Sequence, residues 1–121
     1  MTDASFVILY VDSPARSAEF YSALLGRGPF ESSPTFAMFA LRDDMMLGLW
    51  SRRTVQPAAT AAGGGAEIAF TVDAPEEVDT AHVRWREKGL AIAQAPVDLD
   101  FGRTFVAVDP DGHRLRVFCP G

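Results

Sequence analysis

The chain has 121 residues, 48% of them hydrophobic, and carries a net charge of −5 from 11 basic and 16 acidic side chains. This length predicts one domain with a buried core, and no basic stripe is present that could neutralise a nucleic-acid backbone. No apolar run approaches the roughly 20 residues of a membrane span, and residues 1–5 lack the basic and apolar regions of a secretory signal. We therefore expect a cytoplasmic protein that binds neither nucleic acid nor membranes.

The only cysteine is Cys119, near the end of the chain. One cysteine excludes an internal disulfide and a cysteine metal cluster. We interpret Cys119 as a small apolar residue of the core.

One pattern occurs twice along the chain. An apolar run, an Asp, a small residue, a Pro, a helical stretch and a Gly follow one another from Phe6 to Gly26 and again from Glu67 to Gly89. Asp12 and Asp73 are 61 residues apart, which is half of the chain. Internal repetition of this kind indicates two copies of one structural module.

The first module, residues 5–51, is predicted to follow the order βαβββ. Residues 6–11 are an apolar run typical of a strand buried on both faces. Ser13 is a suitable N-cap before Pro14, and Gly26 a suitable C-cap. Three further strands are expected at residues 30–33, 35–41 and 45–51.

Residues 52–65 are mostly small or helix-breaking and predict a linker that packs no core. The second module, residues 66–119, repeats the first. Its expected elements are a strand at 66–72, a helix from Pro75 closed by Gly89, a strand at 91–95 ended by Pro96, a loop at 97–102, and strands at 103–108 and 114–118. Asp109–His113 joins the last two as a turn.

The fold class predicted from this order is α+β, with two βαβββ modules forming a curved, barrel-like sheet and both helices outside. Alternation along the strands then sorts side chains between the helix face and an inner face. The inner set contains Phe6, Ile8, Tyr10, Met46, Gly48, Trp50, Glu67, Ala69, Thr71, Arg114, Arg116 and Phe118.

Two inner positions of the first module stand out. Glycine is disfavoured inside a strand, so Gly48 indicates that another group approaches the backbone there. Trp50, two residues on, supplies a flat ring on which a planar aromatic molecule could stack. The alternative is an ordinary core tryptophan. Phe36, Met38 and Phe101 are candidate apolar walls, and Arg103 is either a donor to a ligand carboxylate or a solvated loop arginine.

The doubled βαβββ order and the Asp109–Gly112 turn resemble the vicinal oxygen chelate superfamily of glyoxalases, extradiol dioxygenases and bleomycin-resistance-type binding proteins. A narrower resemblance is to phenazine-antibiotic resistance proteins, which bind a planar tricyclic drug unchanged in a groove built by two chains. It is carried by Leu49–Ser51, Phe101–Phe105, Asp109–His113 and Arg116–Val117. The resemblance implies that Trp50 stacks on the ligand and that the protein is a homodimer.

Enzymes of this superfamily hold a metal at four inner positions, which the resemblance places at Phe6, Gly48, Glu67 and Arg116. Only Glu67 can ligate a metal, whereas a catalytic site normally has about three protein ligands. We therefore expect no metal and no other cofactor. The two histidines, His82 on a helix and His113 in a turn, lack metal-ligand spacing and are interpreted as structural.

Glu67 and Arg116 are predicted to form an ion pair where the enzymes hold their metal, because the first and last strands of a module pair. The alternative is that both side chains reach the solvent separately.

The predicted function is sequestration of a planar aromatic antibiotic, phenazine- or bleomycin-like, without catalysis. The candidate ligand-binding residues are Phe36, Met38, Gly48, Trp50, Glu67, Phe101, Arg103 and Arg116. Two alternatives stay open, namely a glyoxalase- or dioxygenase-type enzyme of the same superfamily and a regulatory interaction module.

Overall fold

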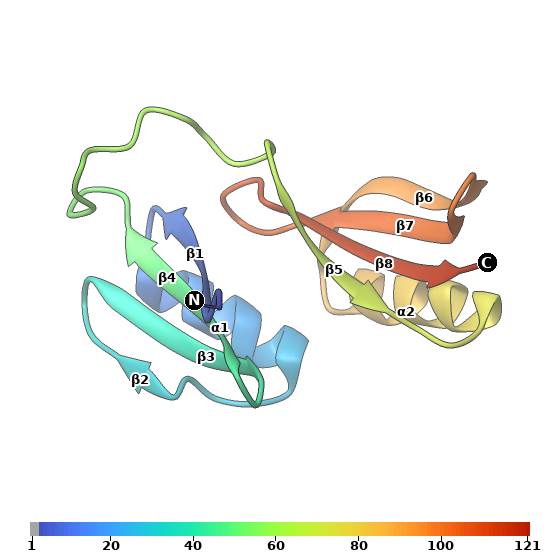
Figure 1. Cartoon of the computed structure of the whole chain (residues 1–121), viewed down its shortest axis with the longest axis horizontal. Coiled ribbons are helices and arrows are strands. Elements are labelled where there is room, and N and C mark those ends of the chain that lie inside the picture. Colours follow the sequence, from blue (N-terminus) through green and yellow to red (C-terminus); the bar gives the residue numbers. More distant parts are fainter. Residues whose placement is uncertain (1–2) are drawn as a thin grey trace. The chain divides into compact units, whose positions relative to one another are not determined.

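The computed structural model describes residues 3–121, which form ten regular elements (Figure 1). Contacts divide the chain into two compact units, Met1–Ala61 and Ala62–Gly121. The elements of the first unit are β1 (Phe6–Val11), α1 (Pro14–Leu25), β2 (Glu31–Ser32), β3 (Phe36–Arg42) and β4 (Met45–Ser51). Those of the second are β5 (Glu67–Thr71), α2 (Pro75–Glu87), β6 (Ala91–Leu99), β7 (Gly102–Val108) and β8 (Arg114–Pro120). The doubled βαβββ order is confirmed.

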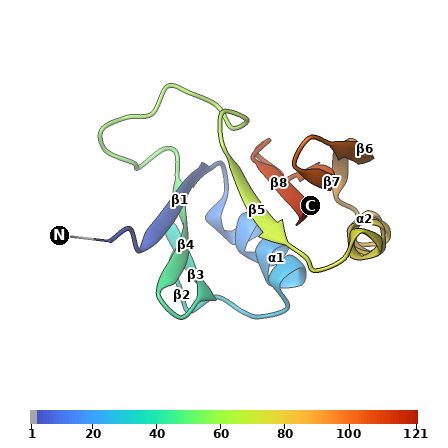
Figure 2. The same cartoon turned by 45° about the vertical axis from the view of Figure 1, so that its right-hand side comes forward.

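Each unit is an open, four-stranded sheet with one helix against it, as Figures 1 and 2 both show. The strand orders are β1-β4-β3-β2 and β5-β8-β7-β6, so the first and last strands of each module are neighbours. These neighbours run parallel, whereas the other pairs are antiparallel. The α+β class is therefore confirmed, with two curved open sheets among the described strands in place of one closed barrel.

Both helices begin and end where the sequence predicts. Ser13 caps α1, since its side chain accepts from the backbone N–H of Arg16 at 3.2 Å, and Gly26 ends it with φ of +71°. Ala74 cannot cap α2 with its side chain. Instead the Glu77 carboxylate accepts from the backbone N–H groups of Asp73 and Ala74, both at 2.9 Å.

The core of each unit lies between its helix and one face of its sheet. Alternate strand residues are buried there with the inward residues of the helix. In the first unit they are Val11, Ala18, Tyr21, Ala37, Phe39, Leu47 and Leu49. In the second they are Val78, Phe105, Ala107, Leu115, Val117 and Cys119. Burying a side chain as large as Phe105 stabilises the fold by about 1.5–3 kcal/mol.

Burial on both faces of β1 was predicted and is wrong. Phe6, Val7, Ile8 and Tyr10 are 36–45% exposed, and only Val11 is fully buried. The strand is an edge strand, and its helix covers only one face of the sheet. Phe6, Ile8 and Tyr10 alternate onto the face that α1 does not cover, and they are 40–45% exposed.

Two other boundaries differ from the prediction. Pro96 does not end β6, because β6 is an edge strand whose register shifts between Gln94 and Val97, where a proline needs no ladder partner. Residues 52–65 are also not entirely unpacked. Val55 is 4% exposed, since a turn brings its backbone N–H to the carbonyl of Ser51 at 3.1 Å.

Both helices, with 12 and 13 residues, lack the length and apolar composition of a transmembrane helix within residues 3–121.

Candidate functional site

The first unit carries an aromatic face, defined here as Tyr10, Phe36, Met38, Gly48 and Trp50, on the side of its sheet that α1 does not cover. Register places Trp50 beside Tyr10 and Phe36, and Gly48 beside Met38. Directly paired residues point to the same side of a sheet. Since Leu47, Leu49, Ala37 and Phe39 are buried on the helix side, the aromatic face is the opposite one. This assigns Phe36 and Met38 to the face of Trp50.

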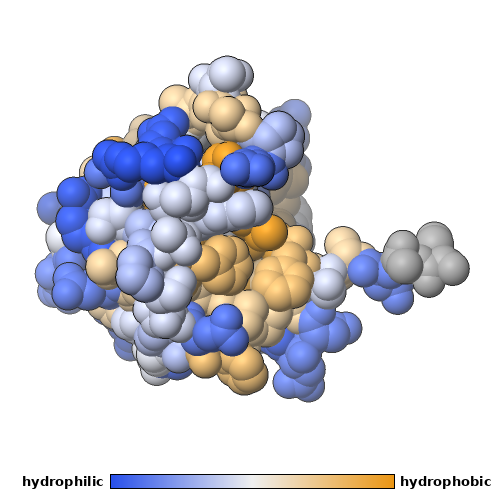
Figure 3. Space-filling view, turned by 90° about the vertical axis from the view of Figure 1, so that its left-hand side faces the viewer, coloured by the Kyte–Doolittle hydropathy of each residue, from blue (hydrophilic) through white to orange (hydrophobic). Residues whose placement is uncertain are grey.

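Trp50 is the centre of this face. Its ring centroid lies 6.3 Å from that of Tyr10 and 6.4 Å from that of Phe36, with both pairs edge-to-face at 81° and 80°. Such contacts restrain the indole beyond the effect of burial alone. Trp50 remains partly exposed and lies on the side of the sheet opposite α1. Figure 3 shows apolar residues gathered on the side of the molecule that it draws, bordered by hydrophilic ones.

Gly48 gives the Phe36 ring its position. A Cβ at residue 48 would lie 2.8 Å from Cζ of Phe36 and 3.3 Å from Cγ1 of Ile8. The group that approaches the backbone is therefore a side chain of the chain itself. Because the Phe36 ring lies over Gly48, it makes an edge-to-face contact with Trp50.

The second unit carries a guanidinium site, defined as Glu67, Phe101, Thr104, Arg116 and Phe118. Arg116 Nε donates to Glu67 Oε1 at 2.7 Å, which confirms the predicted ion pair. Arg116 Nη1 donates to the Thr104 hydroxyl at 3.0 Å, and this hydroxyl donates to the carbonyl of Val117 at 2.9 Å. The Arg116 side chain is 16% exposed and that of Glu67 is 35% exposed, so solvent reaches the carboxylate side of this ion pair.

Two aromatic rings border Arg116. Its Cζ lies 5.6 Å from the centroid of the Phe101 ring, within cation–π range. Phe101, which is 44% exposed, meets Phe118 edge-to-face at 5.7 Å. Sequence reasoning named Phe101 and Phe118 but not Thr104. Thr104 could have been found from its position opposite Phe118 on the neighbouring strand. A hydroxyl buried there needs a polar partner, and Arg116 is on the same face.

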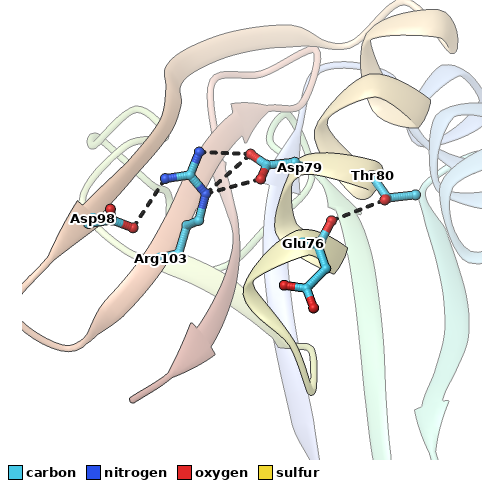
Figure 4. Close-up of polar contacts among 5 residues, drawn as sticks. All are labelled: Glu76, Asp79, Thr80, Asp98 and Arg103. Carbon is cyan, nitrogen blue, oxygen red and sulfur yellow. Dashed lines mark hydrogen bonds and ion pairs between the residues drawn. The ribbon is translucent and has the colours of Figure 1, made fainter.

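Arg103 does not join the guanidinium site. Its Nε and Nη2 donate to the Asp79 carboxylate at 2.9–3.2 Å, and its Nη1 donates to Asp98 at 3.1 Å (Figure 4). These carboxylates raise the pKa of Arg103 through hydrogen bonds, first from Asp79 and then from Asp98. Arg103 is neither a solvated loop residue nor on the face of Arg116. It connects β7 to α2 and β6.

The four positions at which the superfamily's enzymes hold a metal do not fit one here. Phe6 and Gly48 have no donor atom, Arg116 is a cation, and Glu67 is already engaged by that cation. Within residues 3–121, no group of three or more His, Cys, Asp or Glu side chains is arranged to hold a metal ion. No reaction step can be derived through a metal at these positions.

The histidines have structural surroundings. His113 Nδ1 lies 2.8 Å from Asp109 Oδ2, and Asp109 Oδ1 accepts from the backbone N–H groups of Asp111 and His113. This carboxylate organises the β7–β8 turn, in which Gly112 has φ of +84°. The His82 ring packs edge-to-face against Phe105 at 5.2 Å.

Comparison with known proteins identifies the family. Residues 4–117 match the model of the Glyoxalase/Bleomycin resistance protein/Dioxygenase superfamily. The chain belongs to this superfamily. The phenazine antibiotic resistance protein EhpR of Enterobacter agglomerans is 30% identical over 116 residues, which cover 93% of this chain and 88% of that protein.

Solved structures of the superfamily's fold agree with this assignment. The solution NMR structure of protein ATC0852 from Agrobacterium tumefaciens is 52% identical, with a TM-score of 0.91 and coverage of 100% of this chain and 99% of that one. A glyoxalase/bleomycin resistance protein/dioxygenase from Nocardioides is 26% identical, with a TM-score of 0.82 and coverage of 99% and 84%. The superfamily includes both enzymes and resistance proteins by its own description.

Proposed function

We propose that this member of the superfamily binds a small planar aromatic antibiotic, phenazine-like in shape, on its aromatic face and protects the cell by sequestering it. The observation that carries the proposal is the partly exposed Trp50, restrained by Tyr10 and Phe36 on a sheet face without a helix. A restrained indole can stack on a flat ring with little loss of side-chain entropy. The relation to the phenazine resistance protein EhpR supports the choice of ligand class.

Sequestration requires affinity and no reacting group. The donor set at the four metal positions does not suit Lewis-acid chemistry, because it combines one carboxylate with a cation, a phenylalanine and a glycine. The side chains that do surround Trp50 are apolar or aromatic, which suits recognition of a flat apolar molecule.

The proposal is tested by tryptophan fluorescence in a Trp85→Phe background. Trp85 contacts Phe70 and Phe105 in the core of the second unit, and phenylalanine preserves an aromatic ring there. Trp50 is then the only tryptophan, and we expect phenazine to quench its emission in a saturable manner. Emission that does not respond to phenazine at its solubility limit would contradict the proposal.

Trp50→Ala should weaken phenazine binding about tenfold, measured by isothermal titration calorimetry because this variant lacks the reporter. The expected loss combines stacking with the apolar area that the indole buries. Trp85→Phe is the matched control, which changes the other tryptophan and should leave the dissociation constant unchanged. Equal affinity of wild type and Trp50→Ala would place the ligand elsewhere. Turnover of glutathione hemithioacetals or catechols by the wild-type protein would instead support an enzyme.

A further inference from the structure

Arg116 is held from three directions in the middle of β8. Its Nε donates to Glu67, its Nη1 donates to Thr104, and its Cζ lies against the Phe101 ring. Thr104 is fully buried and its hydroxyl also donates to the backbone of Val117. The guanidinium therefore has three neighbours, of which Thr104 is fully buried, whereas the Glu67 side chain is 35% and Phe101 is 44% exposed.

One edge of this guanidinium is not used. Within residues 3–121, no group accepts a hydrogen bond from Arg116 Nη2. Arg103, on the opposite face of the same sheet, provides a contrast, because each of its three nitrogens donates to Asp79 or Asp98. Among the described residues, no buried side-chain nitrogen or oxygen lacks a hydrogen-bond partner, so Nη2 of Arg116 is open to solvent. The same nitrogen is a donor in a fixed position for an incoming acceptor.

The surroundings of Arg116 suit an acceptor carried on an aromatic ring. Phe101 is 44% exposed and meets Phe118 edge-to-face, so apolar ring surface borders the guanidinium. The carboxylate of Glu67, at 2.7 Å, already balances the single positive charge of Arg116. A dianion such as a phosphate monoester would be repelled by Glu67, whereas a single carboxylate forms one charge-assisted hydrogen bond with less repulsion.

We propose that Arg116, positioned by Glu67 and Thr104, binds the carboxylate of a flat aromatic acid, so that the protein prefers aromatic acids to neutral aromatic molecules. The contact involves only residues of the second unit and does not rest on the proposed function. Glu67 has two opposite roles at this site, since it orients the guanidinium and also reduces its attraction for an anion.

The contact is tested without Trp50 by titrating the protein with benzoate and benzamide, two rings of the same size that differ in charge. The Arg116 Nε–Hε resonance in ¹H–¹⁵N NMR spectra should shift in a saturable manner with benzoate. Benzamide should bind at least about tenfold more weakly, as expected for loss of a charge-assisted hydrogen bond. Equal shifts with the two compounds, or none with benzoate, would overturn the proposal.

Substitution of Glu67 distinguishes a ligand site from a purely structural ion pair. Glu67→Gln keeps an oxygen that accepts from Arg116 Nε but removes the competing charge. We expect it to tighten benzoate binding by about three- to tenfold. If the ion pair is purely structural, Glu67→Gln should leave the guanidinium disordered and weaken benzoate binding. That result would overturn the proposal.

Arg114→Gln is the matched control for Arg116→Gln. Arg114 is exposed, belongs to the same strand and alternates onto the same face, so both variants remove one positive charge. Arg116→Gln should weaken benzoate binding about tenfold and Arg114→Gln less than twofold. Equal losses would mean a general charge effect and would overturn the local contact. Thermal denaturation of each variant checks that the fold is retained.

The proposed function and the carboxylate site can be contradicted independently of each other. Phenazine that fails to quench Trp50 while benzoate still shifts Arg116 would contradict the proposed function and support the carboxylate site.

Discussion

Gly48 and Phe36 show how one missing side chain shapes the aromatic face. The Phe36 ring occupies the space that a Cβ at position 48 would need, with Cζ only 2.8 Å from it. The ring of Phe36 in turn meets Trp50 edge-to-face. A glycine inside a strand lowers stability relative to other residues. At position 48 the glycine also makes room for the Phe36 ring, which contacts Trp50.

Gly48→Ala should destabilise the protein by about 1–3 kcal/mol, because the added methyl group forces the Phe36 ring out of its position. Urea denaturation measures this free energy of unfolding. The variant should also bind phenazine more weakly, since Trp50 loses its neighbour.

Phe36→Leu combined with Gly48→Ala provides the control for that prediction. The smaller side chain leaves room for the new methyl group, so the double variant should be more stable than additivity of the two single changes predicts. Strict additivity would mean that the two residues do not compete for the same space.

At the level of elements, Arg103 connects the helix of the second unit to its sheet. It lies on β7 and binds Asp79 of α2 through two nitrogens and Asp98 of β6 through the third (Figure 4). The Asp79 side chain is 49% exposed, whereas that of Asp98 is 79% exposed. Exposed ion pairs contribute little, so we rank Asp79, which is less exposed and is bound through two nitrogens, above Asp98.

Asp79→Asn should lower the melting temperature more than Asp98→Asn, because it removes the bidentate contact. Differential scanning calorimetry of the two variants at low and high salt measures the difference. A larger effect of Asp98→Asn would contradict this ranking.

The same cluster defines a pH dependence. The pKa of Arg103 is raised in the folded protein, so its stabilisation is fully present below the ordinary pKa of arginine and is lost only as pH rises through the raised value. Between pH 6 and 9 we therefore expect no change in stability from Arg103 itself, which thermal denaturation across that range can check.

At the level of the whole molecule, β1 has an uncovered apolar face at a free sheet edge. Phe6, Ile8 and Tyr10 are 40–45% exposed on this face, whereas the corresponding edge strand β5 carries Glu67 and Thr71. Exposed apolar edge strands favour association with another chain. We propose that the protein is a homodimer that covers this part of the first unit.

Ile8→Lys should shift the protein from dimer to monomer in sedimentation velocity experiments, because a charge in a covered apolar surface is unfavourable. Val83→Lys is the matched control. Val83 is 50% exposed on α2, and its substitution should leave the oligomeric state unchanged. A monomeric wild-type protein at micromolar concentration would contradict the proposal.

The sequence by itself determined the doubled module, both helix boundaries, the turn at Asp109–His113 and the pairing of Glu67 with Arg116. These features depend on local signals, such as caps and turn residues, or on strand alternation, which carries over between copies. Only the tertiary structure decided that Phe36 lies over Gly48, that Arg103 turns to Asp79, that β6 continues past Pro96 and that Val55 is buried. Each of these depends on which side chain or strand edge is nearby in space, and local composition does not encode that neighbour.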